Sequence, residues 1–220
     1  MSSGKPKKKK RPAVVVFDLG GVLIGWDPAR AFLPAFSGDK EATRSFLNDV
    51  DFETWNMEQD RGRSWIEAER NFRENHPQYA HIIGQYHDNF DISITGAIAG
   101  TVSILERLHA ANIPLYAITN WAADTFETTR KNYPFMDLFR DIVVSGEEHQ
   151  VKPDPEIYQV LLQRNDLKAE DCVFIDDNQH NVDGARRVGM HAIHFTSPEA
   201  LESALESLLH IQLSAGNSVG

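Results

Sequence analysis

The chain has 220 residues, of which 41% are hydrophobic and 25% are charged, and its formal net charge at pH 7 is −10. Six of the 22 basic residues lie in segment 1–11, which has no acidic residue, so the remainder carries 16 basic residues against 32 acidic ones, a net charge of −16. A body with this charge repels nucleic-acid phosphates, so we expect no nucleic-acid binding from it.

The composition also indicates the cellular compartment in which the protein is expected. No apolar run approaches the roughly 18 residues that a membrane-spanning helix needs, and no signal-peptide pattern follows the basic start. The single cysteine, Cys172, excludes an internal disulfide and suits a reducing compartment. These features predict a cytoplasmic protein without a membrane partner.

The first predicted strand is the apolar segment Ala13–Phe17, and a long insert follows it. About 75 residues separate this strand from the helix that leads to the second strand, whereas a crossover needs only about 10–12. The insert has no convincing strand pattern but several helix signals, among them Asp27-Pro28 and a capping box at Ser64 and Glu67. The sequence therefore predicts a small helical cap after the first strand.

Four further apolar segments alternate with helical patterns along the rest of the chain. They are Leu115–Thr119, Ile142–Ser145, Cys172–Ile175 and His191–Phe195. Apolar strands that alternate with helices predict a parallel sheet covered on both faces. We therefore expect an α/β fold with a doubly wound, five-stranded, Rossmann-like sheet. The expected division is a disordered basic tail at 1–11, a core at 12–23 and 96–210, a cap at 24–95 and a flexible C-terminus at 211–220.

Side chains that can do chemistry follow four of these strands. Asp18 ends the first strand, Thr119 ends the second, Lys152 comes after the third, and Asp176 and Asp177 end the fourth. The carboxyl ends of parallel strands meet at one edge of a sheet, where ligands of such folds bind. Three carboxylates at one edge repel one another and require a cation, and oxygen ligands without a Cys or His cluster favour Mg²⁺.

This set of groups suits phosphoryl transfer. Asp18 could attack phosphorus and form an aspartyl-phosphate, which water would then hydrolyse. Mg²⁺ and Lys152 could neutralise the phosphate oxygens, and the Thr119 hydroxyl could donate a hydrogen bond to one of them.

Four short motifs, FDLGG, AITN, VKPDP and FIDDNQHN, occur in this order, each at or after a predicted strand. With them the chain resembles the haloacid dehalogenase-like hydrolase superfamily, and in particular its helical-cap phosphatases with a DLGG first motif. The resemblance implies that Asp18 is the nucleophile, Thr119 binds phosphate and Lys152 orients both. It also implies a Mg²⁺ held by Asp18, the backbone carbonyl of Gly20 and Asp177, with Asp176 supporting the ion directly or through water.

The expected substrate is a small phosphorylated metabolite, a sugar phosphate being one candidate, and the protein is expected to be a monomer or homodimer. The active site should lie between core and cap. Substrate contacts are expected from Thr119, Asn120, Trp121 and Lys152, with Trp121 as the aromatic contact.

The first motif departs from the pattern of most phosphatases of this superfamily at Gly20, where they carry a second aspartate as general acid and base. Losing a positioned acid or base typically lowers the rate by about 10²–10⁴-fold, most of all when the leaving alkoxide is poor. We therefore expect a preference for better leaving groups, such as aryl, acyl or anomeric sugar phosphates.

Two alternatives stay open. The dehalogenases that name the superfamily also lack this aspartate and need no metal, so a metal-independent 2-haloacid dehalogenase is the first. Paired carboxylates at Asp176 and Asp177 speak against it, because halide displacement has no use for them. The second alternative is a binding or regulatory protein that has kept the fold but lost turnover.

Overall fold

The computed structural model describes residues 12–213, so the predicted basic tail at 1–11 and residues 214–220 lie outside the described part. The core is a five-stranded sheet in the order β5-β4-β1-β6-β7, and every neighbouring pair is parallel. Its strands are β1 (Val14–Phe17), β4 (Leu115–Thr119), β5 (Asp141–Val144), β6 (Cys172–Asp176) and β7 (His191–His194). The five predicted strands and the doubly wound α/β fold are confirmed.

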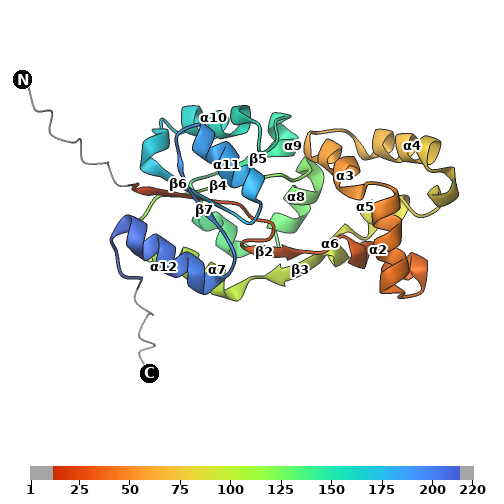
Figure 1. Ribbon diagram of the computed structural model, residues 1–220, viewed down its shortest axis with the longest axis horizontal. Coiled ribbons are helices and arrows are strands. Elements are labelled where there is room, and N and C mark those ends of the chain that lie inside the picture. Colours follow the sequence, from red (N-terminus) through yellow and green to blue (C-terminus); the bar gives the residue numbers. More distant parts are fainter. Residues whose placement is uncertain (1–11, 214–220) are drawn as a thin grey trace, which may run out of the picture.

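Helices cover both faces of this sheet (Figure 1). Val15 and Phe17 of β1 pack into a cluster with residues of α7 (Ala99–Ala110), α8 (Ala123–Arg130) and α12 (Pro198–Leu209). Val14 and Val16 face the other way, toward α10 (Pro155–Arg164) and α11 (Gln179–Arg187). Because successive strand residues point to opposite faces, a strand buried on both sides must be apolar throughout, as VVVF is.

Several core helices begin or end at residue types that are typical of helix ends. The Ser197 hydroxyl accepts a hydrogen bond from the Ala200 N–H at the start of α12, and Gly189 takes a φ of +94° after α11. Asp154 precedes α10, but its side chain makes no capping bond and instead pairs with Arg61 of the cap at 3.2 Å.

The insert after β1 is mostly helical, as predicted. Its helices are α1 (Ala29–Phe32), α2 (Lys40–Asp49), α3 (Phe52–Asp60), α4 (Trp65–Asn75), α5 (Gly84–Asp88) and α6 (Phe90–Ser93). The expectation that the stretch contains no strand was wrong at its edges, where β2 (Ile24–Trp26) pairs antiparallel with β3 (Ile94–Ala97). A Cβ on Gly25 would fall 2.1 Å from Oγ1 of Thr95, so glycine permits the two strands to approach.

Aromatic side chains fill the interior of the cap. Phe32 stacks on Tyr86 with ring centroids 5.4 Å apart and meets Phe46 and Phe52 edge-on. Phe72 of α4 closes this cluster from the other side. The Ser64 hydroxyl accepts a hydrogen bond from the Glu67 N–H at the start of α4, as the capping box predicted. The aromatic side chains belong to the same buried cluster as the sheet residues Val15 and Phe17, so cap and core share one hydrophobic interior.

Three short elements complete the core, namely α9 (Ser145–Glu148) and the 3-10 helices η3 (Pro134–Leu138) and η4 (Ala169–Asp171), while the 3-10 helix η1 (Leu33–Phe36) belongs to the cap. A further 3-10 helix, η2 (Pro77–Tyr79), follows α4. Ordered packing continues past the predicted boundary at 210, because Leu213 is buried and its carbonyl accepts a hydrogen bond from Arg107. No helix within residues 12–213 is long and apolar enough to cross a membrane.

Candidate active site

A buried lysine joins two carboxylates at the carboxyl edge of the sheet. Lys152 Nζ lies 2.7 Å from Asp18 Oδ2 and 2.8 Å from Asp176 Oδ2, and all three side chains are at most 10% exposed. Asp18 follows β1, Asp176 ends β6, and these strands are neighbours in the sheet. The fold therefore brings together three residues that are 24 to 158 positions apart in the chain and that the motifs predicted to meet.

The charges in this cluster shift one another's titration. Burial raises the pKa of Asp18 well above its ordinary value, and the neighbouring Asp176 and Asp177 add to that effect while Lys152 opposes it. Burial favours the neutral form of Lys152, yet Asp176 and Asp18 outweigh it, so the pKa of the ammonium is raised. Lys152 is thus a fixed positive charge beside Asp18.

The oxygens of Asp176 are already engaged. Oδ1 accepts hydrogen bonds from the Asn178 N–H at 2.8 Å and from Asn181 Nδ2 at 3.1 Å, and Oδ2 accepts from Lys152 Nζ. The Asp177 side chain is exposed to the cavity beside it. Asp176 is therefore placed to hold Lys152 and the following loop, whereas Asp177 has oxygens available for a ligand.

A divalent cation fits this arrangement. Asp18, Asp176 and Asp177 each offer a carboxylate oxygen, and these three atoms lie within 4.8 Å of one another. Burial and the charge of Asp176 raise the pKa of Asp177, and a cation bound here would offset both effects. An all-oxygen donor set suits Mg²⁺, which Asp18 and Asp177 could hold together with the carbonyl of Gly20.

The turn after Asp18 is shaped around Asp177. Gly21 has a φ of +73°, and a Cβ built on it would lie 2.1 Å from Oδ2 of Asp177. Only glycine leaves room for that carboxylate. Gly20, one residue earlier, has no atom within 4 Å of a Cβ, so a side chain could stand there.

Gly21→Ala is expected to lower the free energy of unfolding by about 1–3 kcal/mol and to weaken Mg²⁺ binding, because the new methyl group displaces Asp177. Urea unfolding and the Mg²⁺-induced rise in the thermal midpoint would measure the two effects. Gly38→Ala is the matched control, since Gly38 has a φ of +84° but open space around a Cβ. Equal Mg²⁺ responses in both variants would contradict this account.

The last residue of β4 and the residue that follows it have different surroundings. Thr119 is 1% exposed, and its hydroxyl has no hydrogen-bond partner within the described residues, so it is available to a phosphate at the sheet edge. Asn120, predicted as a substrate contact, also holds the Lys152 backbone. Its Oδ1 accepts from the Lys152 N–H at 2.8 Å, and its Nδ2 donates to the Lys152 carbonyl at 3.1 Å. Asn120 therefore fixes the position of Lys152.

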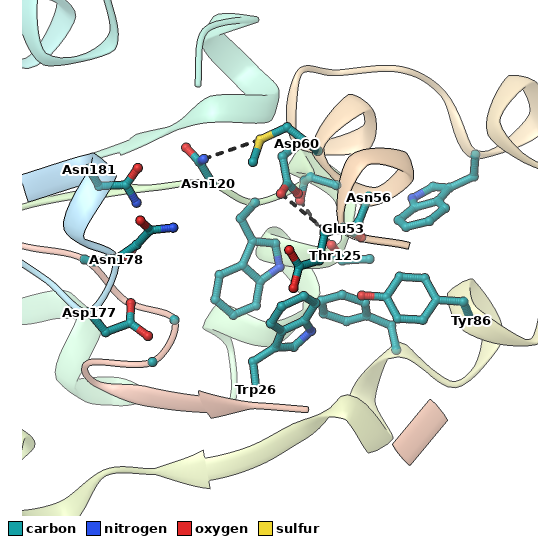
Figure 2. A pocket seen from close by; sticks show the side chains of 18 residues that line it. Trp26, Glu53, Asn56, Asp60, Tyr86, Asn120, Thr125, Asp177, Asn178 and Asn181 are labelled. Atoms are coloured by element: carbon teal, nitrogen blue, oxygen red, sulfur yellow. Dashed lines mark hydrogen bonds between the residues drawn. The ribbon is translucent and has the colours of Figure 1, made fainter. Parts of the chain in front are cut away.

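A cavity of about 410 Å³ opens between this edge and the cap. Figure 2 shows Asp177, Asn178 and Asn181 of the core on one side and Glu53, Asn56 and Asp60 of the cap on the other. A set of large apolar side chains completes the lining: Trp26, Met57, Trp65, Tyr86, Phe90 and Trp121. Trp121, which the sequence predicted as a substrate-contacting aromatic, is one of these lining residues.

The sequence analysis missed the contribution of α3. Glu53, Asn56, Met57 and Asp60 follow the helical pattern i, i+3, i+4, i+7 and share one face of α3, which lines the cavity. That spacing was visible in the sequence. Which face of a cap helix meets the core could not be seen there, because it depends on how the cap packs.

Polar contacts hold the cap against the core. Arg61 pairs with Asp154, and its carbonyl lies 3.1 Å from Nδ1 of His149. On the other side of the cavity, Trp65 Nε1 donates to Asp124 Oδ1 at 3.1 Å, and His87 Nε2 lies 3.5 Å from the same carboxylate. These contacts place the cap over the buried lysine.

Residues 38–195 match the haloacid dehalogenase-like hydrolase family. The chain belongs to this family. The match covers more than half of the chain and spans most of the cap and core, and the protein is accordingly a hydrolase of the haloacid dehalogenase-like type.

Individual relatives agree with this assignment. A sesquiterpene phosphatase of Aspergillus oryzae is 29% identical over 197 residues, which cover 88% of this chain and 95% of that protein. The fold is similar to that of a haloacid dehalogenase family enzyme from Bacteroides thetaiotaomicron, with a TM-score of 0.72, 19% identity, and coverage of 89% of this chain and 99% of that one.

The fold similarity extends to a dehalogenase. The L-2-haloacid dehalogenase of Xanthobacter autotrophicus has a TM-score of 0.63 and 19% identity, covering 89% of this chain and 83% of that one. The fold thus occurs in phosphatases and dehalogenases, and it does not distinguish phosphate release from halide release. The side chains at the site have to do so.

Proposed function

We propose that this hydrolase is a Mg²⁺-dependent phosphatase that cleaves the phosphomonoester of a small apolar alcohol through an aspartyl-phosphate on Asp18. The observation that carries the proposal is the cluster of three carboxylates around Lys152, whose oxygens lie within the span of one divalent cation. Displacement of a halide needs one nucleophilic carboxylate and has no use for the other two.

In this mechanism the Asp18 carboxylate attacks phosphorus while Lys152 holds one of its oxygens in place at 2.7 Å. The Leu19 N–H holds the other oxygen at 2.7 Å. The Thr119 hydroxyl donates to a phosphate oxygen, and Asn120 keeps Lys152 in register. When bound, Mg²⁺ supplies positive charge to the phosphate oxygens. The cap, residues 24–95, closes the cavity and excludes bulk water during attack.

The lining of the cavity supports an apolar organic group rather than a sugar. Five aromatic side chains line the cavity, those of Trp26, Trp65, Tyr86, Phe90 and Trp121. Burying such surface against an apolar ligand is favourable, by roughly 25 cal/mol per Å². The name of the Aspergillus oryzae relative, a sesquiterpene phosphatase, agrees with a substrate of this kind. The free, buried Cys172 suits the reducing cytoplasm in which we place the enzyme.

Product release would test the proposal. The full chain is incubated with farnesyl phosphate, decyl phosphate, glucose 1-phosphate and 2-chloropropionate, each with Mg²⁺ and with EDTA, while phosphate and chloride are measured. We expect Mg²⁺-dependent phosphate release, with kcat/KM at least tenfold higher for the two apolar esters than for the sugar phosphate.

Other outcomes would each point elsewhere. Chloride release that survives EDTA would replace the phosphatase by a dehalogenase. A faster reaction with glucose 1-phosphate would overturn the apolar substrate class but keep the phosphatase. No release from any compound, in a protein whose thermal midpoint still rises with Mg²⁺, would favour a binding protein without turnover.

A further inference from the structure

The cap carries a carboxyl group that the predicted chemistry does not use. Asp60, the last residue of α3, lines the same cavity as Asp18 and Gly20. Figure 2 shows Asp60 on the cap side of the cavity, across from Asp177 of the core. The side chain is therefore inside the active site although it belongs to another part of the chain.

The surroundings of Asp60 hold its carboxyl group in place. Asn56 Nδ2 donates to Asp60 Oδ2 at 3.3 Å, one turn earlier on α3. The Ala122 N–H, three residues beyond Thr119, lies close enough to this carboxyl group to lower its pKa. The second contact comes from the core loop that follows β4, so Asp60 is tied to the catalytic edge of the sheet.

Burial raises the pKa of Asp60 to about 7, although Lys152 and the Ala122 N–H act in the opposite direction. The other titratable groups that line its cavity are Tyr86, Glu53, Asp18 and Asp177, and the charge of Lys152 also acts on Asp60. A carboxyl group that titrates near neutral pH can both give and accept a proton there, which is what a general acid and base requires.

The opposite wall lacks such a group. Gly20 stands where related phosphatases carry an aspartate, and no atom lies within 4 Å of the place where its Cβ would be. A proton donor for the leaving oxygen must then come from elsewhere in the cavity. Lys152 cannot serve, because its raised pKa and its contacts with Asp18 and Asp176 keep it protonated.

Resting on the proposed function, we propose that Asp60 of the cap is the general acid and base of the reaction, replacing the aspartate that is absent at Gly20. Contact with the core loop at Ala122 means that the group is delivered by the cap in its closed position. Acid–base catalysis would then depend on cap closure, whereas the nucleophile and the cation site belong to the core.

Asp60 gives up a proton in the first step of the reaction and takes one back in the second. In the first, Asp18 forms a bond to phosphorus, the P–O ester bond breaks, and the leaving oxygen takes the proton of Asp60 and departs as the alcohol. In the second, the Asp60 carboxylate removes a proton from water as its oxygen attacks phosphorus, releasing inorganic phosphate. Asp18 is then free and Asp60 is protonated again.

This assignment changes the expectation for leaving groups. Without an acid, the enzyme should prefer esters of acidic alcohols; with Asp60 as the acid, esters of ordinary alcohols are also good substrates. An apolar primary alcohol is a poor leaving group, so it is the substrate type for which Asp60 matters most.

An Asp60→Asn variant tests the role with two substrates, decyl phosphate and 4-nitrophenyl phosphate. We expect kcat/KM to fall by about 10²–10⁴-fold for decyl phosphate and by less than threefold for 4-nitrophenyl phosphate, whose leaving group needs no proton. Stopped-flow measurements with the second substrate should show a burst of nitrophenolate, because hydrolysis of the phosphoenzyme has lost its base. Glu58→Gln, which removes an exposed carboxylate of α3 that does not line the cavity, is the matched control and should change neither kcat/KM by more than threefold.

Equal losses on both substrates, or a decyl phosphate kcat/KM within threefold of the unmodified enzyme, would overturn the assignment. The ratio between substrates is insensitive to the fraction of folded variant. Absence of phosphate release by the unmodified enzyme would instead refute the proposed function. In the double variant Gly20→Asp/Asp60→Asn, at least tenfold recovery with decyl phosphate is expected; a folded double variant without recovery would count against Asp60.

Discussion

Asp18→Asn is expected to lower the phosphatase kcat by about 10⁴–10⁶-fold while the protein stays folded. The amide is a far weaker nucleophile than the carboxylate, which Lys152 holds at one oxygen and the Leu19 N–H holds at the other. The fold should not suffer, because Lys152 keeps its partner Asp176 at 2.8 Å.

The same substitution should reveal what the site does to stability. The Asp18 carboxyl is 7% exposed, and its pKa is raised chiefly by burial, with Asp176 and Asp177 adding repulsion. Removing this charge in the absence of metal should therefore stabilise the protein by about 0.5–2 kcal/mol. The Mg²⁺-induced rise in the thermal midpoint should largely disappear, because one of the carboxylates is gone.

Steady-state phosphate release and differential scanning fluorimetry, each with and without Mg²⁺, would check these expectations. Asp137→Asn is a suitable control, because its side chain is 79% exposed and lies outside the cavity. Activity within tenfold of the unmodified enzyme would show that Asp18 is not the nucleophile. An unchanged response to Mg²⁺ would show that the cation does not bind where the carboxylates converge.

Much of the core could be predicted because its strands are buried on both faces. Segments such as VVVF and LYAIT contain no charged residue, and their alternation with helices leaves few topologies. β2 and β3 escaped prediction since they are three and four residues long, contain Gly25 and Gly96, and are partly exposed. Their pairing depends on contacts between segments about 70 residues apart, which no local pattern reveals.

The meeting of candidate site residues at one edge of the sheet was predictable for a related reason. Asp18, Lys152 and Asp176 meet because parallel strands bring their carboxyl ends to one edge, and the order of strands follows from the connections. The bidentate hold of Asn120 on the Lys152 backbone could not be foreseen, since it depends on the path of two loops. Asp60 was missed because its position depends on the packing of cap against core.

Lys152→Met is expected to remove activity as completely as Asp18→Asn but to affect stability in the opposite direction. The substitution leaves Asp18 and Asp176 buried without their shared cation, and breaking a buried ion pair by removing one partner typically costs about 3–5 kcal/mol. Methionine resembles lysine in length, so little of this loss comes from packing against Phe174, over whose ring the ammonium lies at 5.5 Å.

Urea unfolding in EDTA would measure the loss, with Lys168→Met as the control, because exposed Lys168 should change the unfolding free energy by no more than about 0.5 kcal/mol. Combining Lys152→Met with Asp18→Asn should recover part of the stability, since one of the two uncompensated carboxylates becomes neutral. Two single-variant effects that simply add would contradict this coupling. The comparison separates two contributions to the free energy of unfolding: the buried charge of Asp18 lowers it, and the ion pair with Lys152 offsets that loss.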